Sequence, residues 1–433
     1  MNIFQPSSWF SNSKNIQVPQ KKSYVSNDRS YLDYILSGRS SVSATQAEFF
    51  YKNTAAIATA VDMIVGAVKQ ISPVLQTKTG EYISEHEILD FIKDPNGFDN
   101  YEDFIETIFS NFLLNNNTFC VAIGDVNSKP IELWSLQQQN ITVQEASDTY
   151  PLSYLVNRGV VIGNFERSQI NKKINFYSGN LKQLYHIKGY SSGSSQLLGD
   201  SFLQSAANEA RQLIKGKLHN LSTLTSGGRP SMLFAFKDPD GLNDDKHRER
   251  KSMINDQLMG PENAGKAVII SNADIEAVKE MSISNKDMDY AILEQLAAKT
   301  IYMRYKIPLP LITTEASSFN NFEKSIEFFY DSAVLPAFTK IFSGLSDFLL
   351  PRFKDPKNSK IVKITYNPET IEPLQPRQIA QVKTRKEIGI ETINELRSDM
   401  PNREPLENGD TLYQAANLIP VGDDLFTDDN NAT

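Results

Sequence analysis

The stretch YMRYKIPLPLITTEASSFNNFEKSIEFFY, residues 302–330, places two prolines two positions apart between two apolar helical patterns. Proline has no amide hydrogen and restricts the residue before it, so Pro308 and Pro310 cannot lie inside one continuous helix. The sequence therefore predicts that one helix ends here and another begins after a short joint. Small polar residues dominate the eight positions after the second proline, and they predict a flexible middle.

The segments on both sides of the joint have helical periodicity. A helix is predicted over 285–306, and a long one over about 320–350 with a bend near Pro336. A third helix is predicted over 200–226 and should end at Gly227-Gly228. Its apolar stripe comprises Leu203, Ala206, Ala210, Leu213, Ile214, Leu218, Leu221 and Leu224.

The region before residue 200 reads as a mixed α+β body. Helices are predicted over 46–71, over HEILDFI at 86–92 and over 101–114, the last capped by Asn100. The expected strands lie at 118–125, 131–136, 140–146, 154–165, 172–177 and 181–190. We interpret these strands as one sheet-like run.

A smaller unit is predicted between the helices 200–226 and 285–306. Its expected elements are a strand at 231–236, a helix at 242–259 and strands at 266–271 and 275–283. The helix carries a dense charge cluster, DDKHRERK. Two interpretations stay open for this cluster: a solvated helix face, or a docking surface formed by Lys246, Arg248, Arg250 and Lys251. Two short helices are expected at 376–388 and 391–398.

Composition and charge exclude several classes of protein. Its 433 residues carry a net charge of −8, which disfavours tight binding of nucleic acid because phosphate contacts need basic residues. Cys120 is the single cysteine, so an intramolecular disulfide is excluded. The first residues lack the pattern of a signal peptide, and no run approaches the roughly 18 apolar residues of a membrane span. We therefore expect a soluble, non-secreted protein.

Catalytic and metal-binding motifs do not appear. The four histidines are not at metal-ligand spacing, and HEILD begins like a zinc motif but has Asp90 where the second histidine belongs. There is no P-loop and no nucleophile elbow. We expect no catalytic, cofactor-binding or metal-binding residues, and hence no enzyme.

The order of these pieces resembles the portal proteins of long-tailed bacteriophages. The resemblance begins with AAIATAVDMIVGAVKQI and HEILDFIKDPNGFDNYEDFIETIFSNFLLNNNTFCVA, where Asn116 to Phe119 take the place of a Gly-Asn-x-Tyr motif. No single motif is specific, but the ordered series across about 300 residues is. It continues through IELWSLQQQNITV, LYHIKGY, LLGDSFLQSAANEARQLI, GGRPSMLF, NAGKAVII, DYAILEQLAAKTIYMRYKIPLPLI and NNFEKSIEFFYDSAVLPAF.

The resemblance implies an α+β portal fold with defined parts. These are an N-terminal arm (1–45), a wing (46–199 and 321–375), two stem helices (200–227 and 284–306), a clip (228–283), a tunnel loop (307–320), and a crown with a disordered tail (376–433). The proline joint then falls in the tunnel loop, at the narrowest part of a channel. Pro308 and Pro310 are expected to end the stem helix, and Ser318 or Asn320, with Glu323, to cap the next one.

The resemblance also implies a function. Portal proteins form a dodecameric ring at one capsid vertex, the head-tail connector through which the viral genome is packaged and ejected. The implied partners are other copies of the chain, the major capsid protein, the large terminase, a head-tail adaptor and double-stranded DNA passing without sequence specificity. No membrane and no cofactor are implied. The location is the virion, after assembly in the host cytoplasm.

Two sets of site residues follow from the resemblance. The DNA channel is expected at the tunnel loop, with Thr313, Thr314, Glu315, Ser317, Ser318 and Asn320. Stem packing is expected at Leu203, Leu213, Leu221, Ile292 and Leu296. Three alternatives stay open: another head-completion or adaptor protein, an enzyme with a carboxylate site, or a monomer in which the joint is an ordinary helix connection.

Overall fold

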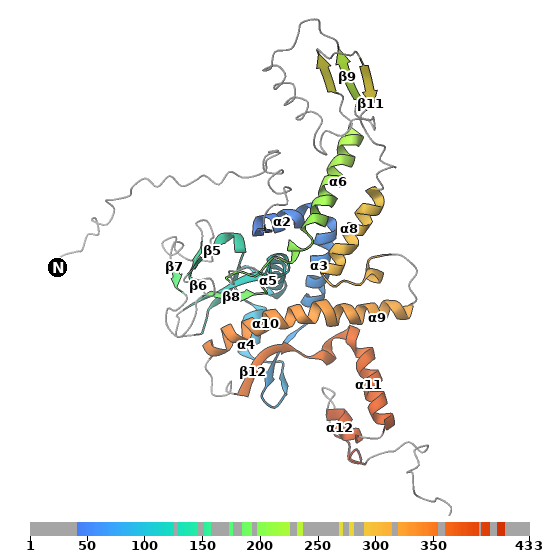
Figure 1. Cartoon of the computed structure of the whole chain (residues 1–433). Coiled ribbons are helices and arrows are strands. Elements are labelled where there is room, and N and C mark those ends of the chain that lie inside the picture. The colour runs from blue at the N-terminus through green and yellow to red at the C-terminus, as the bar shows by residue number, and fades with distance from the viewer. Residues whose placement is uncertain are drawn as a thin grey trace, which may run out of the picture. The chain divides into compact units, whose positions relative to one another are not determined.

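The computed structural model describes residues 41–411, with gaps at 125–128, 146–150, 157–172, 176–183, 193–196, 226–231, 237–267, 272–276, 281–289, 314–318, 354–359, 389–390 and 399–404. The chain divides into two compact units, Met1–Ser40 and Ser41–Thr433, and everything described below belongs to the second (Figure 1). The predicted arm lies outside the described residues except for its last five, and residues 412–433 of the predicted tail also lie outside.

The helix predicted over 46–71 is two helices, α2 (Ala44–Asn53) and α3 (Ala55–Lys69). The break falls at Thr54, whose backbone is extended with φ −127°. The Asn53 side chain donates to the carbonyl of Phe49 at 2.8 Å, and the Thr54 carbonyl accepts the first amide bonds of α3. Asparagine and threonine compete with helical hydrogen bonding, so this pair ends one helix and begins another.

Two predicted helix starts are confirmed, those of α4 (Glu87–Lys93) and α5 (Tyr101–Asn115). His86 caps α4 by accepting from the amide of Ile88 at 3.1 Å, which explains the HEILD motif without a metal. Asn100 caps α5 by accepting from the amide of Asp103 at 2.9 Å. The predicted inner face of α5 is buried, with Phe104, Ile105, Ile108, Phe109 and Phe112 each at most 4% exposed.

The strands of the body form separate antiparallel sheets, where the sequence suggested one continuous run. Each sheet has three strands, in the orders β12-β1-β2, β4-β3-β8 and β5-β6-β7. Their bounds are β1 Pro73–Thr77, β2 Tyr82–Ile83, β3 Asn117–Ile123, β4 Glu132–Leu136, β5 Ile141–Glu145, β6 Pro151–Val156, β7 Lys173–Asn175, β8 Leu184–Lys188 and β12 Ile361–Tyr366.

The small unit contains a further sheet with the order β10-β9-β11. Its strands are β9 (Met232–Phe236), β10 (Val268–Ser271) and β11 (Ala277–Glu280), at the three predicted places. β10 runs parallel to β9, and β11 runs antiparallel. A parallel pair needs a crossover connection between its strands. The helix predicted at 242–259 falls on that connection, outside the described residues.

The long helix predicted over 320–350 is α9 (Phe319–Phe329), a π-helical turn (Tyr330–Val334) and α10 (Leu335–Leu349). Leu335 donates its amide to Tyr330, five residues back. Pro336 supplies no amide, and its ring crowds the carbonyl four residues before it, so the preceding turn widens. The predicted bend near Pro336 is thus a π-helical turn.

The core lies where α10 packs on β12 and β8 and meets α5 through a pair of rings. Phe342 stacks on Phe338 at 4.0 Å between ring centroids and faces Phe109 of α5 at 6.4 Å. Gly344 allows close approach to β8, since a Cβ there would lie 2.6 Å from the Ile187 side chain. The helical run 321–352 is long and apolar enough to cross a membrane, but 67% of its most apolar window is buried inside the protein, as in a core helix.

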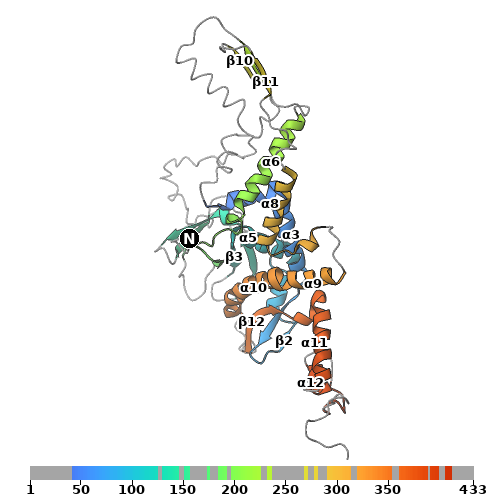
Figure 2. The same cartoon turned by 45° about the vertical axis from the view of Figure 1, so that its right-hand side comes forward.

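Two long helices, α6 (Ala207–Thr225) and α8 (Tyr290–Arg304), pack against each other (Figures 1 and 2). A 3-10 turn at Phe202–Gln204 precedes α6, so the predicted helix over 200–226 begins seven residues later than expected. The predicted C-terminal helices are present as α11 (Gln375–Ile388) and α12 (Ile393–Ser398).

Candidate functional site

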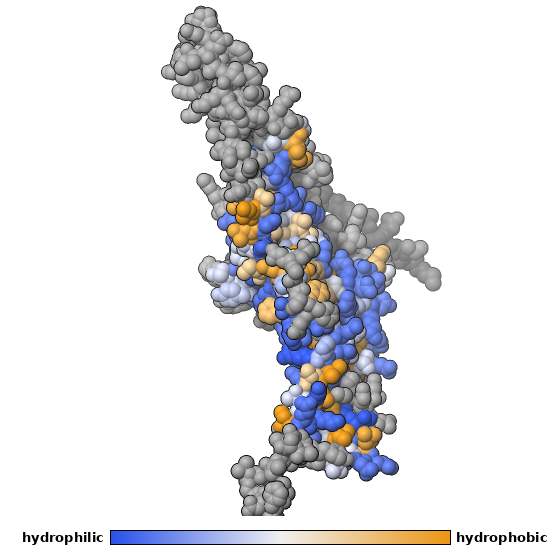
Figure 3. All heavy atoms as spheres, turned by 90° about the vertical axis from the view of Figure 1, so that its right-hand side faces the viewer, coloured by the Kyte–Doolittle hydropathy of each residue, from blue (hydrophilic) through white to orange (hydrophobic). Residues whose placement is uncertain are grey.

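The helix pair α6 and α8 is buried at one end and exposed at the other. Near the body, Ala210 and Leu213 of α6 and Ala297 and Ile301 of α8 are at most 5% exposed. At the far end the apolar side chains face solvent. They are Leu221 (62%), Leu224 (74%), Ile292 (62%), Leu293 (41%) and Leu296 (59%). Orange patches interrupt the hydrophilic surface of the described chain in Figure 3.

The predicted stem-packing residues therefore fall into two groups. Leu203 and Leu213 are 0% and 5% exposed, so the chain itself buries them. Leu221, Ile292 and Leu296 have no such cover within the described chain. These three side chains are available for a contact with another molecule.

The end of α8 is a Schellman motif built on Lys306. The amide of Ile307 donates to Tyr302 at 2.9 Å, and that of Lys306 donates to Met303 at 3.0 Å. Lys306 has φ 58°, the left-handed conformation that this motif requires. Ile307, 2% exposed, supplies the buried apolar residue after the cap. The backbone motif therefore ends α8 before either proline, where the sequence predicted that the prolines end it.

The prolines shape the segment that follows. Pro308 precedes a 3-10 turn over Leu309–Leu311, with Pro310 inside the turn. The amides of Ile312 and Thr313 both donate to Leu309 at 2.9 Å. Leu309 and Leu311 are half-buried.

The predicted channel residues of this segment are only partly described. Thr313 is half-buried, and Thr314, Glu315, Ser317 and Ser318 lie outside the described residues. Asn320 lies in the first turn of α9, which begins at Phe319, so the expectation that Asn320 caps this helix is wrong.

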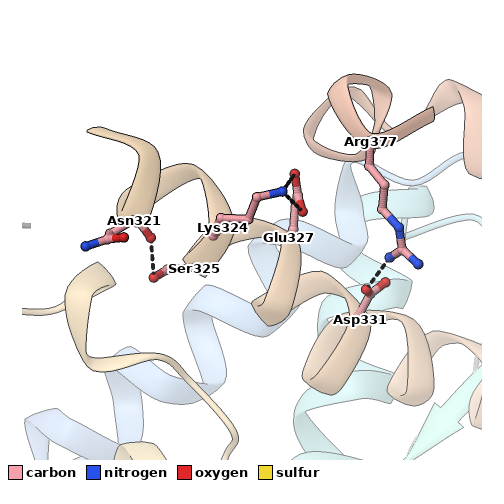
Figure 4. A network of polar contacts seen from close by, with 6 residues as sticks. All are labelled: Asn321, Lys324, Ser325, Glu327, Asp331 and Arg377. Carbon is pink, nitrogen blue, oxygen red and sulfur yellow. Dashed lines mark hydrogen bonds and ion pairs between the residues drawn. The ribbon is translucent and has the colours of Figure 1, made fainter. Parts of the chain in front are cut away.

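Polar contacts tie the elements beyond the joint together (Figure 4). In α9, Lys324 pairs with Glu327 at 3.0 Å, and Ser325 donates to the carbonyl of Asn321 at 2.7 Å. Arg377 of α11 reaches Asp331 of the π-helical turn at 2.7 Å. Ser332, the next residue of that turn, donates to the carbonyl of Phe328 at 2.6 Å and lies 3.4 Å from that of Lys306. The turn is thus bonded to α11 and lies beside the joint.

A polar node at the end of α5 anchors both helices of the pair to the body. The last carbonyls of a helix lack intrahelical partners. Here Leu113 accepts from the Tyr305 hydroxyl after α8 at 3.2 Å, and Leu114 accepts from the Ser201 hydroxyl before α6 at 2.5 Å. Phe202 adds ring contacts with Phe112 and Tyr305 at 5.9 and 6.3 Å. The node fixes the base of the pair.

Asn116 and Asn117 complete this node. Asn116 is left-handed with φ 57°; its backbone carbonyl accepts from Gly189, and its side chain donates to Tyr190. The Asn117 amide group accepts from the Gly199 amide and donates to the Gly199 carbonyl, both at 2.8 Å. The sequence singled out Asn116 and Asn117 only through a family motif, because Gly189, Tyr190 and Gly199 lie more than 70 residues away along the chain.

His186 of β8 joins the node from the sheet. Its Nε2 lies 3.0 Å from Asn117 Oδ1, an acceptor, so Nε2 carries the proton. The imidazole stacks on Phe119 at 4.2 Å. Burial, and secondly the charge of Lys188, lower the pKa of His186 to about 3. This histidine is therefore neutral at physiological pH and acts as a structural donor.

Lys246, Arg248, Arg250 and Lys251, the predicted docking cluster, lie outside the described residues. Within the described part of the chain, no group of three or more His, Cys, Asp or Glu side chains is arranged to hold a metal. Cys120 is buried, and its desolvation raises the pKa of its thiol to about 12, as for an inert core residue.

Solved structures with a similar fold come from gene transfer agent particles. A chain in the virion of the native particle gives a TM-score of 0.58 at 19% identity, covering 82% of this chain and 92% of that one. A chain in the neck of the native particle, computed with C12 symmetry, gives 0.56 at 19% identity, covering 81% and 91%. The α+β fold described above is therefore the fold of these neck and virion chains.

Sequence comparison identifies the family. An uncharacterized protein of Rickettsia felis is 24% identical over 341 residues, which cover 78% of this chain and 83% of that protein. An uncharacterized protein of Rickettsia bellii is 24% identical over 286 residues, covering 65% and 70%. The model of the phage portal protein family matches residues 55–399. This chain therefore belongs to the phage portal protein family.

Proposed function

We propose that the chain assembles into a dodecameric ring at one capsid vertex and forms the head-tail connector through which double-stranded DNA is packaged and ejected. The ring itself catalyses no reaction. A separate large terminase drives packaging, and a head-tail adaptor binds to the ring. The ring forms in the host cytoplasm and remains in the virion, in contact with the major capsid protein. Membership of the portal family supports this proposal, and the C12 symmetry of the similar neck suggests the subunit number.

The exposed far end of the helix pair is the observation that carries the proposal. Leu221, Ile292 and Leu296 are each about 60% exposed on two helices whose other ends are buried. Burying one such side chain stabilises an interface by roughly 1.5–3 kcal/mol. In a ring, a neighbouring subunit covers this face and buries these side chains. In a monomer they remain exposed to solvent.

The proposed parts follow the chain. The stem consists of α6 and α8, the clip contains β9, β10 and β11, and the wing contains the body with α9 and α10. The crown contains α11 and α12. The tunnel loop is 307–320, and its base is fixed on one side by the Schellman motif of Lys306 and the 3-10 turn after it.

Assembly is tested by native mass measurement of the full chain. We expect a ring near twelve times 48.7 kDa. Leu221→Glu, Ile292→Glu and Leu296→Glu should each abolish the ring while circular dichroism keeps its helical signal. The matched control is Ile131→Glu, since Ile131 is 75% exposed but belongs to neither helix of the pair and lies just before β4. A wild-type chain that stays monomeric or dimeric would favour an adaptor protein instead.

The tunnel loop is tested separately. Deletion of 313–318 should leave the ring assembled but impair packaging or retention of DNA. Glu315→Lys with Ser317→Lys should make the ring bind DNA and slow its passage, because each added lysine forms a phosphate contact. Packaging at the wild-type rate in both variants would make this segment a mere connector.

The docking role of the clip cluster has its own test. Charge reversal at Lys246, Arg248, Arg250 and Lys251 should weaken binding of terminase or adaptor, and wild-type binding should fall steeply with salt. Unchanged binding of the reversed variant at low salt would leave these residues as a solvated surface.

A further inference from the structure

A cavity of about 280 Å³ lies in the body between α2, α5 and the 3-10 turn at Gln138–Asn140. It is at the lower limit of ligand-site volumes, with room for roughly nine waters at about 30 Å³ each. Its walls include Tyr51 of α2 and Leu114 of α5. No residue of the helix pair or the joint lines it, although Leu114 and Asn115 of the lining also belong to the polar node at the end of α5.

Amide side chains are the most frequent kind of polar group in the lining. They are Asn111, Asn115, Gln137, Gln138 and Gln139. Among them, Asn111 Nδ2, Asn115 Oδ1 and Gln138 Oε1 are buried and have no hydrogen-bond partner. Asn115 as a whole is 9% exposed. A buried polar atom without a partner is destabilising, and native chains leave few of them.

These three atoms are one donor and two acceptors, all uncharged. All three atoms are covered in the structure, so binding requires each amide to rotate toward the cavity, which the broad terminal torsion wells of asparagine and glutamine permit. A ligand that fits must therefore offer both N–H donors and C=O acceptors at short spacing.

The charges at the cavity are already matched. Lys52 pairs with Glu48 at 2.6 Å, and Glu106 pairs with Lys69 outside the lining. Lys52 is the one cation in the lining, and it is already paired, so no cation is left over for a phosphate. A nucleotide or another anion is disfavoured on these grounds, and a neutral ligand is favoured.

The peptide group is neutral and carries one donor and one acceptor in each residue. We propose that this cavity binds an extended, uncharged stretch of polypeptide, held by hydrogen bonds from its backbone to Asn111, Asn115 and Gln138. The proposal does not depend on ring assembly, because the cavity lies within one chain.

The test uses the full chain with p-benzoylphenylalanine in place of Thr107, which lines the cavity and is exposed. The probe is biotinylated N-acetyl-Gly-Asn-Gly N-methylamide. The matched probe replaces its central amide N–H by an ester oxygen and so removes one donor. We expect the chain to crosslink about five times more of the peptide probe than of the ester probe. As a control, p-benzoylphenylalanine in place of Thr384 of α11 should crosslink the peptide probe only at background level.

Two variants with apolar side chains complete the test. Asn111→Leu and Gln138→Leu should each reduce labelling at least fivefold without lowering the unfolding temperature, because each removes an unpaired polar atom. Equal labelling by peptide and ester, or labelling unchanged in both variants, would overturn the proposal. So would competition by a dinucleotide, which would assign the cavity to nucleic acid, or a density map showing only water on the three atoms with the peptide present.

Discussion

The helices α5 and α8 both end on a left-handed residue that is not glycine, and they hold it in different ways. Asn116 (φ 57°) is 9% exposed and bonded through both its backbone and its side chain to the segment 189–190. Lys306 (φ 58°) is exposed, and the Schellman bonds around it involve only backbone atoms. One helix end depends on its particular side chain, whereas the other depends only on the shape of its backbone.

The difference matters for the proposed mechanics of the chain. The α5 end is a buried node that fixes the bases of α6 and α8. The α8 end leads into the joint, where the side chain faces solvent and the fold imposes little on its identity. Substitutions should therefore have large effects at the node and small ones at the joint.

The largest effect is expected for Gly199→Ala at the node. A Cβ there would lie 2.7 Å from the carbonyl oxygen of Asn116 and 3.1 Å from the backbone of Gly189. Backbone atoms cannot move aside as a side chain does, so we expect a loss of about 3 kcal/mol in the free energy of unfolding.

Urea unfolding at fixed protein concentration measures this loss. The control is Gly66→Ala in α3, where nothing lies within 4 Å of the added carbon. That change should stabilise the chain by up to about 1 kcal/mol through helix propensity. Equal effects at the two glycines would show that the node is not tightly packed.

Acid should be the next strongest perturbation, and it acts on the node through His186. The pKa of this histidine is about 3 in the fold, against about 6.5 in an unfolded chain. Between these values the unfolded state binds a proton that the fold does not. The full contribution to stability is therefore present above pH 6.5 and is lost as the pH falls toward 3, by about 2 kcal/mol at pH 5.

The measurement compares urea unfolding at pH 7.5 and pH 5 in the wild type and in His186→Asn. The variant lacks the titrating group, so its free energy of unfolding should fall less between the two pH values. A wild type and variant with the same pH dependence would contradict the assignment of a neutral, buried imidazole.

The sequence anticipated features that depend on local chemistry. The Asn100 cap, the apolar face of α5 and the strands of the small unit were predicted because capping and periodicity act within a few residues. The sequence predicted one continuous helix where the chain breaks at Thr54, and it predicted a bend near Pro336 without showing that the bend is a π-helical turn. Both arise from competition among backbone hydrogen bonds, which periodicity alone does not reveal.

The candidate site was predictable in its position but not in its exposure. The apolar stripe of the helix over 200–226 continues from Leu203 to Leu221, yet the first is buried by its own chain and the second is exposed. Periodicity shows that a face is apolar and says nothing of which chain covers it. The Schellman motif was also missed, because its usual signal, a glycine, is replaced by Lys306.

Glycine at the two left-handed positions should have opposite effects of about 1 kcal/mol. Lys306→Gly removes the steric penalty of a side chain at φ 58° and should stabilise the chain by up to about 1 kcal/mol. Asn116→Gly removes a smaller penalty, because asparagine tolerates the left-handed region better than lysine does, and it loses the side-chain bond to Tyr190, so it should destabilise the chain by about 1 kcal/mol. Urea unfolding of both variants measures these changes in the free energy of unfolding. The control is Lys306→Ala, which should not increase stability. Stabilisation by both glycines would remove the distinction between the two ends.

The smallest effect is expected for Arg377→Ala, which breaks the ion pair between α11 and the π-helical turn beside the joint. Its two side chains are 50% and 45% exposed, so solvent screens their attraction. We expect a loss of about 0.2–1 kcal/mol at 50 mM NaCl that shrinks further in 1 M NaCl. The control is Lys383→Ala. Lys383 pairs with Glu387 of the same helix, so this ion pair does not connect α11 to another element. If Arg377→Ala instead costs more than the Gly199→Ala change, then α11 holds the π-helical turn in place, and the joint depends on a specific side chain as much as the node does.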